Sequence, residues 1–235
     1  MSNSIDFLNK GVELNDKQIH IFLFRLEDFD EKELYGVLSE DEKERADRLK
    51  VELKKKQFIL ARSLLRKLLS NSTDIRLDEI EFYYGEHDKP FIKNTYKNIE
   101  FNLSHSDQCI VIAITLENKV GVDVEKINTE IDHDSLSKRF FSKEEYSYLI
   151  KLNNNNKLDA FYRIWTRKEA FIKATGEGIA FGLDNFSVFG DSTKVEIKNE
   201  KNSNEDWYCF DLMNIKQYES ALVSNNKDVE LIFYP

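Results

Sequence analysis

The chain has 235 residues, of which 41% are hydrophobic and 33% are charged, and its 34 basic and 43 acidic side chains give a net charge of −9. This length and composition suit a soluble globular protein with one large domain or two small ones. The acidic balance argues against general binding to nucleic acid or to anionic membranes, because both need an excess of Lys and Arg.

The N-terminal sequence MSNSIDFLNKGVEL has neither a basic region followed by an apolar segment nor a long apolar run. We therefore expect no signal peptide, no membrane span and a cytoplasmic location. Cys109 and Cys209 lie in strand-like stretches without the spacing of metal ligands. We expect both to be small buried side chains.

The first half reads as a strand, a long helix and a set of short strands. Alternation predicts a strand over 18–26, and Ser39 followed by acids predicts a helix that begins there and runs to about Leu69. Four β-branched or aromatic runs then predict strands: IEFYYG, IEFNLSHS, CIVIAITL and VGVDVEKI.

The second half changes to helices and then to strands. Ser142 with Glu145 three residues later predicts a capped helix, and a polar NNNNK loop separates it from the helix LDAFYRIWTRKEAFIKATG. The remaining runs predict antiparallel strands: NFSVFG, KVEIKN, WYCFDL, ESALVS and VELIFYP. We predict an α+β fold with an N-terminal half over 1–118 and a C-terminal half over 119–235.

The segment GVDVEK carries two acids among valines. In a strand, Asp123 and Glu125 project to one side while the flanking valines face the other. Two neighbouring carboxylates raise each other's pKa or bind a cation, and oxygen ligands suit a hard ion such as Mg²⁺. The alternative is a half-exposed strand with an acidic, solvated face.

The helix FYRIWTRKEAFIKATGEG adds a third carboxylate and two lysines. Lys168 falls inside an apolar stripe, and Glu169 and Lys173 lie on its shoulder one turn apart. A structural explanation is an i,i+4 ion pair together with a lysine whose amine reaches solvent. The functional explanation is a metal-bound diphosphate neutralised by lysines. The stripe consists of Phe161, Ile164, Trp165 and Ile172.

Several upstream residues could bind an anion. Ser104 and His105 end a predicted strand, and Lys89 lies in a loop restricted by Pro90. Each has a structural alternative, since a histidine at a strand end commonly makes a structural hydrogen bond and basic residues on helices are usually solvated. The basic residues of the first long helix include Arg45, Arg48, Lys56, Arg62 and Arg66.

In order, the segments KPF, FNLSHS, GVDVEKI, RFFSKEEY and WTRKEAFIKATGEGI resemble the 4′-phosphopantetheinyl transferase superfamily, in its double-length type that acts on carrier proteins. These motifs span Lys89 to Ile179. The resemblance implies two similar α/β subdomains around a pseudo-twofold axis, with coenzyme A in the cleft between them. The loop departs from the family's usual Gly-Lys-Pro, because Asp88 precedes the lysine.

The resemblance also implies a reaction. The phosphopantetheine arm of coenzyme A would move to a serine of an apo acyl or peptidyl carrier protein, releasing adenosine 3′,5′-bisphosphate. Asp123, Glu125 and Glu169 would hold Mg²⁺. Lys173 would lie on the α-phosphate side, with Lys168 beside it as a further catalytic lysine.

By the same resemblance, Lys89 with Pro90, Ser104 and His105 would hold the adenine and 3′-phosphate end of coenzyme A. One basic residue of the first helix would help. Arg62 is our prediction for it, with Arg45 and Lys56 as alternatives.

The serine hydroxyl needs a base, for which we favour Glu169, directly or through water, over Lys173. A Mg²⁺-dependent phosphodiester or pyrophosphate hydrolase could use the same groups, and a silent carrier-binding or coenzyme A-binding protein is a third alternative. A transferase needs an apolar surface for its carrier, and RFFSKEEYSYLI offers Phe140, Phe141 and Tyr146. We expect a monomer.

Overall fold

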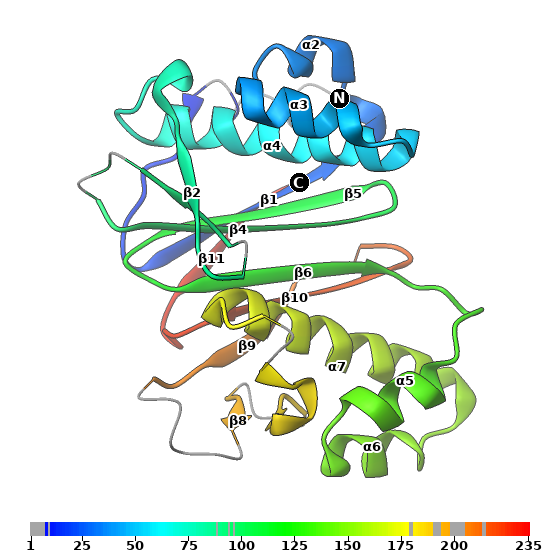
Figure 1. The fold of residues 1–235 in the computed structure, drawn as a ribbon. Helices are drawn as coiled ribbons and strands as arrows, with labels where there is room; N and C mark the ends of the chain where they lie inside the picture. The colour runs from blue at the N-terminus through cyan, green and yellow to red at the C-terminus, as the bar shows by residue number, and fades with distance from the viewer. Residues whose placement is uncertain are drawn as a thin grey trace. The chain divides into compact units, whose positions relative to one another are not determined.

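A computed structural model describes residues 8, 10–87, 89–93, 95, 97–178, 181–189, 194–197, 205–212 and 215–235. The mixed α+β class predicted from the sequence is confirmed. The chain forms two compact units: unit 1 comprises 1–85, 90–117 and 229–235, and unit 2 comprises 86–89 and 118–228. Each unit contains a sheet covered by one long helix (Figure 1). None of the described helices is long and apolar enough to cross a membrane.

Unit 1 is built on a four-stranded sheet in the order β11-β1-β5-β4. Strand β5 pairs antiparallel with both β1 and β4, whereas β11 pairs parallel with β1. Strands β2 and β3 pair with each other in a separate antiparallel two-stranded sheet. The bounds are β1 Gln18–Arg25, β2 Phe82–Tyr84, β3 Pro90–Ile92, β4 Ile99–Ser106, β5 Cys109–Leu116 and β11 Glu230–Tyr234.

The helices of unit 1 are α2 (Glu31–Tyr35), α3 (Glu40–Arg48) and α4 (Glu52–Ser72), with short 3-10 turns η1 (Leu26–Asp28) and η2 (Leu77–Glu79). Helix α4 runs along the sheet, and α2 and α3 lie on its outer side (Figure 1). Its apolar residues pack against inward-facing strand residues in one buried core, which includes Leu60, Leu64, Leu68, Phe22, Phe101 and Ile112.

The single helix predicted from Ser39 to about Leu69 is wrong, because the chain breaks into α3 and α4. Leu49 and Val51 have extended backbone conformations, with ψ of 118° and 113°. In a straight helix Glu42 and Arg62 would be about 30 Å apart. They are instead in contact, with Arg62 Nε 2.7 Å from Glu42 Oε1. The break therefore lets α3 fold back along α4.

Unit 2 has a three-stranded antiparallel sheet in the order β6-β10-β9, and α7 lies across one of its faces (Figure 1). Smaller elements complete the unit around a core that includes Phe161, Phe171, Phe186, Ala221 and Val223. The bounds are β6 Val120–Lys126, α5 His133–Phe140, α6 Lys143–Leu149, α7 Asn154–Thr175, η4 Leu183–Asn185, β7 Phe186–Ser187, β8 Glu196–Ile197, β9 Tyr208–Asp211 and β10 Tyr218–Ser224.

Two further predictions about the C-terminal half are corrected. The asparagine run is not wholly a loop, because Asn153 caps α7 by accepting a hydrogen bond from the Asn156 backbone N–H at 3.0 Å. The segment VELIFYP is not an antiparallel strand of the C-terminal half: β11 pairs parallel with β1 and belongs to unit 1. Alternation predicts a strand but not its partner.

Both cysteines are buried, as predicted. Burial raises the pKa of Cys109 to about 11 and that of Cys209 to about 12. Burial therefore favours the neutral thiol form of both cysteines.

Candidate active site

The candidate site is formed where β6 passes very close to α7. A Cβ atom on Gly121 would lie 2.1 Å from the carbonyl oxygen of Ala170 and 2.4 Å from the backbone nitrogen of Ala174. Only glycine permits this approach, because those neighbours are backbone atoms that cannot rotate away. Since side chains alternate along a strand, the face of β6 that carries Gly121 also carries Asp123 and Glu125.

Asp123 is buried, with only 3% of its surface exposed. The alternative of a solvated acidic face is therefore wrong for this residue. Its carboxylate oxygen Oδ1 accepts a hydrogen bond from Lys173 Nζ at 2.6 Å, and the same amine lies 3.3 Å from the carbonyl of Val122. Strand and helix are thus joined by a partly buried ion pair.

Glu169 lies beside this pair on α7. Burial raises the pKa of the Glu169 carboxyl, and the negative charges of Asp123 and Glu125 raise it further, while Lys173 acts in the opposite direction. The structure therefore pairs Asp123 with Lys173 and places Glu169 within the electrostatic influence of Asp123, Glu125 and Lys173. A carboxyl whose pKa is raised toward neutrality is a more effective proton acceptor than an ordinary glutamate.

The three acids Asp123, Glu125 and Glu169 fit a magnesium ion by donor type, because Mg²⁺ prefers oxygen ligands. Their negative charges also repel one another until a cation is bound. The structure does not present a finished metal pocket. Across the residues that it describes, no three His, Cys, Asp or Glu side chains are gathered closely enough to hold a metal ion. In this conformation the cation beside Asp123 is Lys173.

Lys168 does not lie with Lys173, although both were predicted to face the phosphates. It is fully buried, and its amine lies 2.7 Å from Glu145 Oε2, which is also fully buried. The two lysines are five residues apart on α7, so they project about 140° apart around the helix axis. Helical periodicity placed Lys168 in the apolar stripe, and the structure confirms its position there without access to solvent.

Lys89 lies in the short segment 86–89 of unit 2 and is 9% exposed. Its amine donates to the carbonyl of Ala174 at 3.0 Å and lies 3.4 Å from the carbonyl of Val120. It therefore fastens the C-terminal end of α7 to the start of β6. Pro90 begins β3. The acid at position 88, which departs from the family pattern, lies outside the described residues.

Ser104 and His105 lie near the end of β4 in unit 1, as the strand pattern predicts. Ser104 is buried opposite Val111, and His105 is half-buried opposite Ile110. The carboxylates belong to unit 2. A coenzyme A cleft between the halves stays a prediction.

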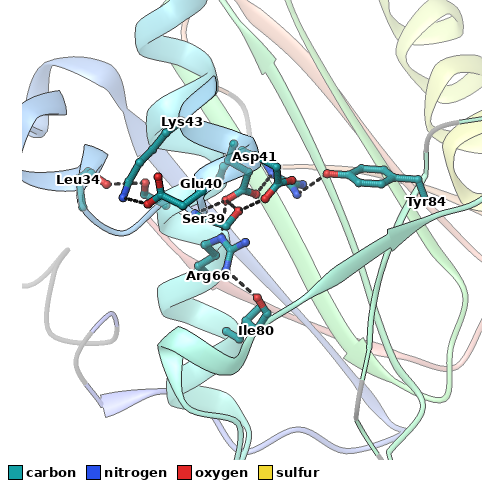
Figure 2. A network of polar contacts seen from close by, with 11 residues as sticks. Leu34, Ser39, Glu40, Asp41, Lys43, Arg66, Ile80 and Tyr84 are labelled. Atoms are coloured by element: carbon teal, nitrogen blue, oxygen red, sulfur yellow. Dashed lines mark hydrogen bonds and ion pairs between the residues drawn. The ribbon is translucent and has the colours of Figure 1, made fainter. Parts of the chain in front are cut away.

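Arg62, our choice for the 3′-phosphate, is instead part of a buried network. Its Nε donates to Glu42, and its Nη2 donates to the hydroxyl of Tyr84 at 2.9 Å. Arg66 donates to the other oxygen of Glu42 and to the carbonyl of Ile80. Figure 2 shows Arg66 reaching Ile80, with Tyr84 pointing toward the same cluster. An apolar core explains this pairing, because a buried guanidinium needs a counterion.

Arg45, the alternative, is exposed on α3, with its guanidinium 5.2 Å from the centre of the Phe58 ring. Lys56, the other alternative, is half-buried on α4.

Three apolar residues were predicted to form a surface for the carrier protein. The prediction is wrong for Phe141, because that residue is 4% exposed and stacks on Phe161. Phe140 and Tyr146 are half-buried.

Sequence reasoning missed the roles of two glutamates. Glu42 follows Ser39 by three residues and Glu145 follows Ser142 by three, and each is the third helical residue (N3), whose side chain completes a capping box. Each also neutralises a buried cation of the next long helix, Arg62 and Arg66 in unit 1 and Lys168 in unit 2. The signal was the S-x-x-E pattern, which by itself indicates only a helix start.

Comparisons with known proteins fit this geometry. Residues 119–223 match the model of the 4′-phosphopantetheinyl transferase superfamily, and residues 29–117 match the model named 4′-phosphopantetheinyl transferase, N-terminal. The 4′-phosphopantetheinyl transferase psf-1 of Bacillus pumilus is 30% identical over 175 residues, which cover 72% of this chain and 73% of that protein. The chain belongs to the 4′-phosphopantetheinyl transferase superfamily.

Two other members of the superfamily match more strongly over shorter regions. The 4′-phosphopantetheinyl transferase HetI of a Nostoc species is 35% identical over 151 residues, covering 63% of this chain and 64% of that protein. The 4′-phosphopantetheinyl transferase Sfp of Bacillus subtilis is 36% identical over 130 residues, covering 55% and 56%. The chain therefore matches somewhat more than half the length of these two relatives.

Proposed function

We propose that this chain transfers the 4′-phosphopantetheine group of coenzyme A to a serine of an apo acyl or peptidyl carrier protein and releases adenosine 3′,5′-bisphosphate. The observation that supports this most directly is the cluster of Asp123, Lys173 and Glu169, held together by the close approach at Gly121. Family membership supports the same reaction.

In this reaction the serine oxygen forms a bond to the β-phosphorus of coenzyme A, and the phosphoanhydride bond to the adenosine bisphosphate breaks. Glu169 takes the serine proton, directly or through water. Lys173 is less suited to be the base, because its amine already donates a hydrogen bond to the Asp123 carboxylate. As an ammonium ion it stabilises the charge on the leaving bisphosphate.

Asp123, Glu125 and Glu169 are the residues that would hold Mg²⁺. When bound there, the ion would neutralise negative charge on the diphosphate. Lys173 must then exchange its contact with Asp123 for a contact with the phosphate. The enzyme is accordingly expected to lose activity when a chelator removes divalent ions.

The adenine and 3′-phosphate end of coenzyme A is proposed to bind at Ser104 and His105. Arg45 replaces Arg62 as the proposed basic partner, since Arg45 is exposed and Arg62 is engaged with Glu42. Lys89 and Pro90 shape the adjoining loop. We further propose that the protein works as a cytoplasmic monomer.

The test is the intact mass of an apo carrier protein after incubation with this protein, coenzyme A and Mg²⁺, with and without a chelator. A mass gain of one phosphopantetheine that the chelator abolishes is the expected result. Breakdown of coenzyme A without carrier would instead point to a hydrolase. No gain on acyl or peptidyl carriers, with coenzyme A intact, would contradict the proposed transfer and point to a silent binding protein.

A further inference from the structure

The amine of Lys168 is fully engaged inside unit 2. It lies 2.7 Å from each of three acceptors: the Glu145 carboxylate, the carbonyl of Leu183 and the carbonyl of Phe186. An ammonium group has three N–H donors, so these partners use all of them. The amine also lies 4.3 Å from the centre of the Phe186 ring. Lys168 cannot reach a phosphate without giving up this set.

Glu145 extends the network in two directions. Its Oε2 accepts from the backbone N–H of Ser142, and its Oε1 accepts from the backbone N–H of Val188, both at 2.8 Å. One carboxylate thus joins the start of α6, the middle of α7 and Val188, the residue that follows β7. Because both charges are fully buried, neither tolerates loss of the other.

The position of this pair on α7 connects it to the candidate site. Lys168 and Ala170 project about 200° apart, on opposite sides of the helix. The backbone of Ala170, together with that of Ala174 one turn later, meets Gly121 of β6. The helix is therefore held from two opposite sides, and Glu169 projects between them, about 100° from each.

We propose that Lys168 is a positioning residue that, with Glu145, fixes the rotation of α7 about its axis and so places Glu169 and Lys173 against Asp123, without touching substrate. This inference rests on the proposed transferase function for its effect on turnover. Lys168 then has no contact with a phosphate. It forms a buried ion pair with Glu145, and changing either residue alone leaves the other charge unpaired.

The test is a cycle of Lys168→Met, Glu145→Gln and the double variant, with folding checked by circular dichroism. Each single change leaves one buried charge unpaired, so turnover should fall by about tenfold or more while the KM for coenzyme A stays within about twofold. In the double variant no charge is unpaired, and turnover should recover most of that loss. Lys173→Met with Glu145→Gln is the matched control and should show no recovery.

A folded Lys168→Met, Glu145→Gln double variant that is as inactive as the matched control would overturn the inference, because it would show that the Lys168 amine is needed by the substrate. If a single variant fails to fold, the double variant still decides between these outcomes. Hydrogen exchange over α7 gives a readout that needs no activity. Faster exchange around Glu169 in Lys168→Met, reversed in the double variant, supports positioning even if wild type transfers nothing, whereas unchanged exchange in folded Lys168→Met contradicts it.

Discussion

At the scale of single residues, the candidate site contains a carboxyl, that of Glu169, whose ionised form is disfavoured by its surroundings. Glu169 lies near Asp123 and Glu125 and is partly withdrawn from water, and both effects favour its protonated form. Lys173 counters them from the next turn of α7. The ionisation of Glu169 therefore depends on the charges of Asp123, Glu125 and Lys173 together.

Glu169→Gln should fold and still bind coenzyme A, but turnover with an apo carrier should fall by about 10² to 10⁴, because the amide cannot accept the serine proton. Calorimetry with coenzyme A and a steady-state transfer assay would measure the two effects. Asp159→Asn, an exposed acid on the same helix, is the control. Turnover within a few fold of wild type in Glu169→Gln would remove this residue from the chemistry.

Gly121→Ala should lower stability far more than the addition of one methyl group normally does. The added methyl group would meet backbone atoms of Ala170 and Ala174, so β6 and α7 would have to separate. We expect a loss of about 1 to 3 kcal/mol in the free energy of unfolding, typical of overpacking, measured by urea denaturation. Transfer should fall too, since Asp123 would move away from Lys173.

Gly36→Ala provides the control for that experiment, because no atom lies within 4 Å of its added Cβ. Its stability should be unchanged or slightly higher. An equal loss of unfolding free energy in Gly121→Ala and Gly36→Ala would mean that the close approach of β6 to α7 is not the reason why Gly121 cannot be replaced.

At the scale of elements, the long helices of the two units carry buried cations that are neutralised from a preceding helix start. In unit 1, burial alone would raise the pKa of Glu42, but Arg62 and Arg66 outweigh it and the net effect is a lowered pKa. A carboxyl whose pKa is lower in the folded state stabilises the fold above its unfolded pKa, about 4.3, and loses that contribution as the pH falls through its folded pKa.

Glu42→Gln should therefore lower the free energy of unfolding by about 3 to 5 kcal/mol at pH 7, because two guanidinium groups lose their counterion. The difference from wild type should shrink as the pH falls from the unfolded pKa, about 4.3, through the lower folded pKa, because the wild-type carboxyl then also loses its charge. Urea denaturation across pH measures it. Glu40→Gln, whose side chain is 87% exposed, should change stability by about 0.5 kcal/mol or less. A difference that does not vary with pH would contradict the ion-pair explanation.

The elements also show how far sequence patterns reach. Runs of β-branched and aromatic residues predicted β4, β5 and β6, and helical periodicity placed Glu169 and Lys173 together on α7. The break between α3 and α4 has no proline or glycine to mark it. It is accompanied by a contact between Glu42 of α3 and Arg62 of α4, which are too far apart in the sequence for local propensity to reveal.

The same limit explains the errors at the site. A lysine in an apolar stripe is compatible with snorkelling, phosphate binding or a buried ion pair, and only the position of Glu145 decides among them. For Arg62, likewise, a basic side chain on a helix gives no sign that its counterion comes from the start of α3.

At the scale of the whole molecule, each unit has its own core, but neither unit is one continuous stretch of the chain. Tyr234 of β11 stacks on Phe22 with ring centres 4.7 Å apart, and its hydroxyl lies 3.0 Å from His20 Nδ1. A residue that follows unit 2 along the chain thus supports the sheet of unit 1.

Tyr234→Ala should therefore weaken unit 1 and spare unit 2. Hydrogen exchange followed by mass spectrometry should show lost protection in β1 and β5, with β10 unchanged, because only the first two strands belong to the sheet that β11 completes. Tyr208→Ala, on β9 of the other sheet, should show the reverse. Equal loss of protection in both sheets would mean that the units unfold together.

The parallel pairing of β11 with β1 also has a consequence for synthesis. Gln18 and Glu230 are register partners, so the sheet of unit 1 is completed only after the whole of unit 2 has left the ribosome. At the usual rate of about 5 to 20 residues per second, that interval is on the order of ten seconds. During it, β1 is an uncovered sheet edge that can pair with another nascent chain. The yield of soluble protein should therefore depend on chaperones and on expression rate.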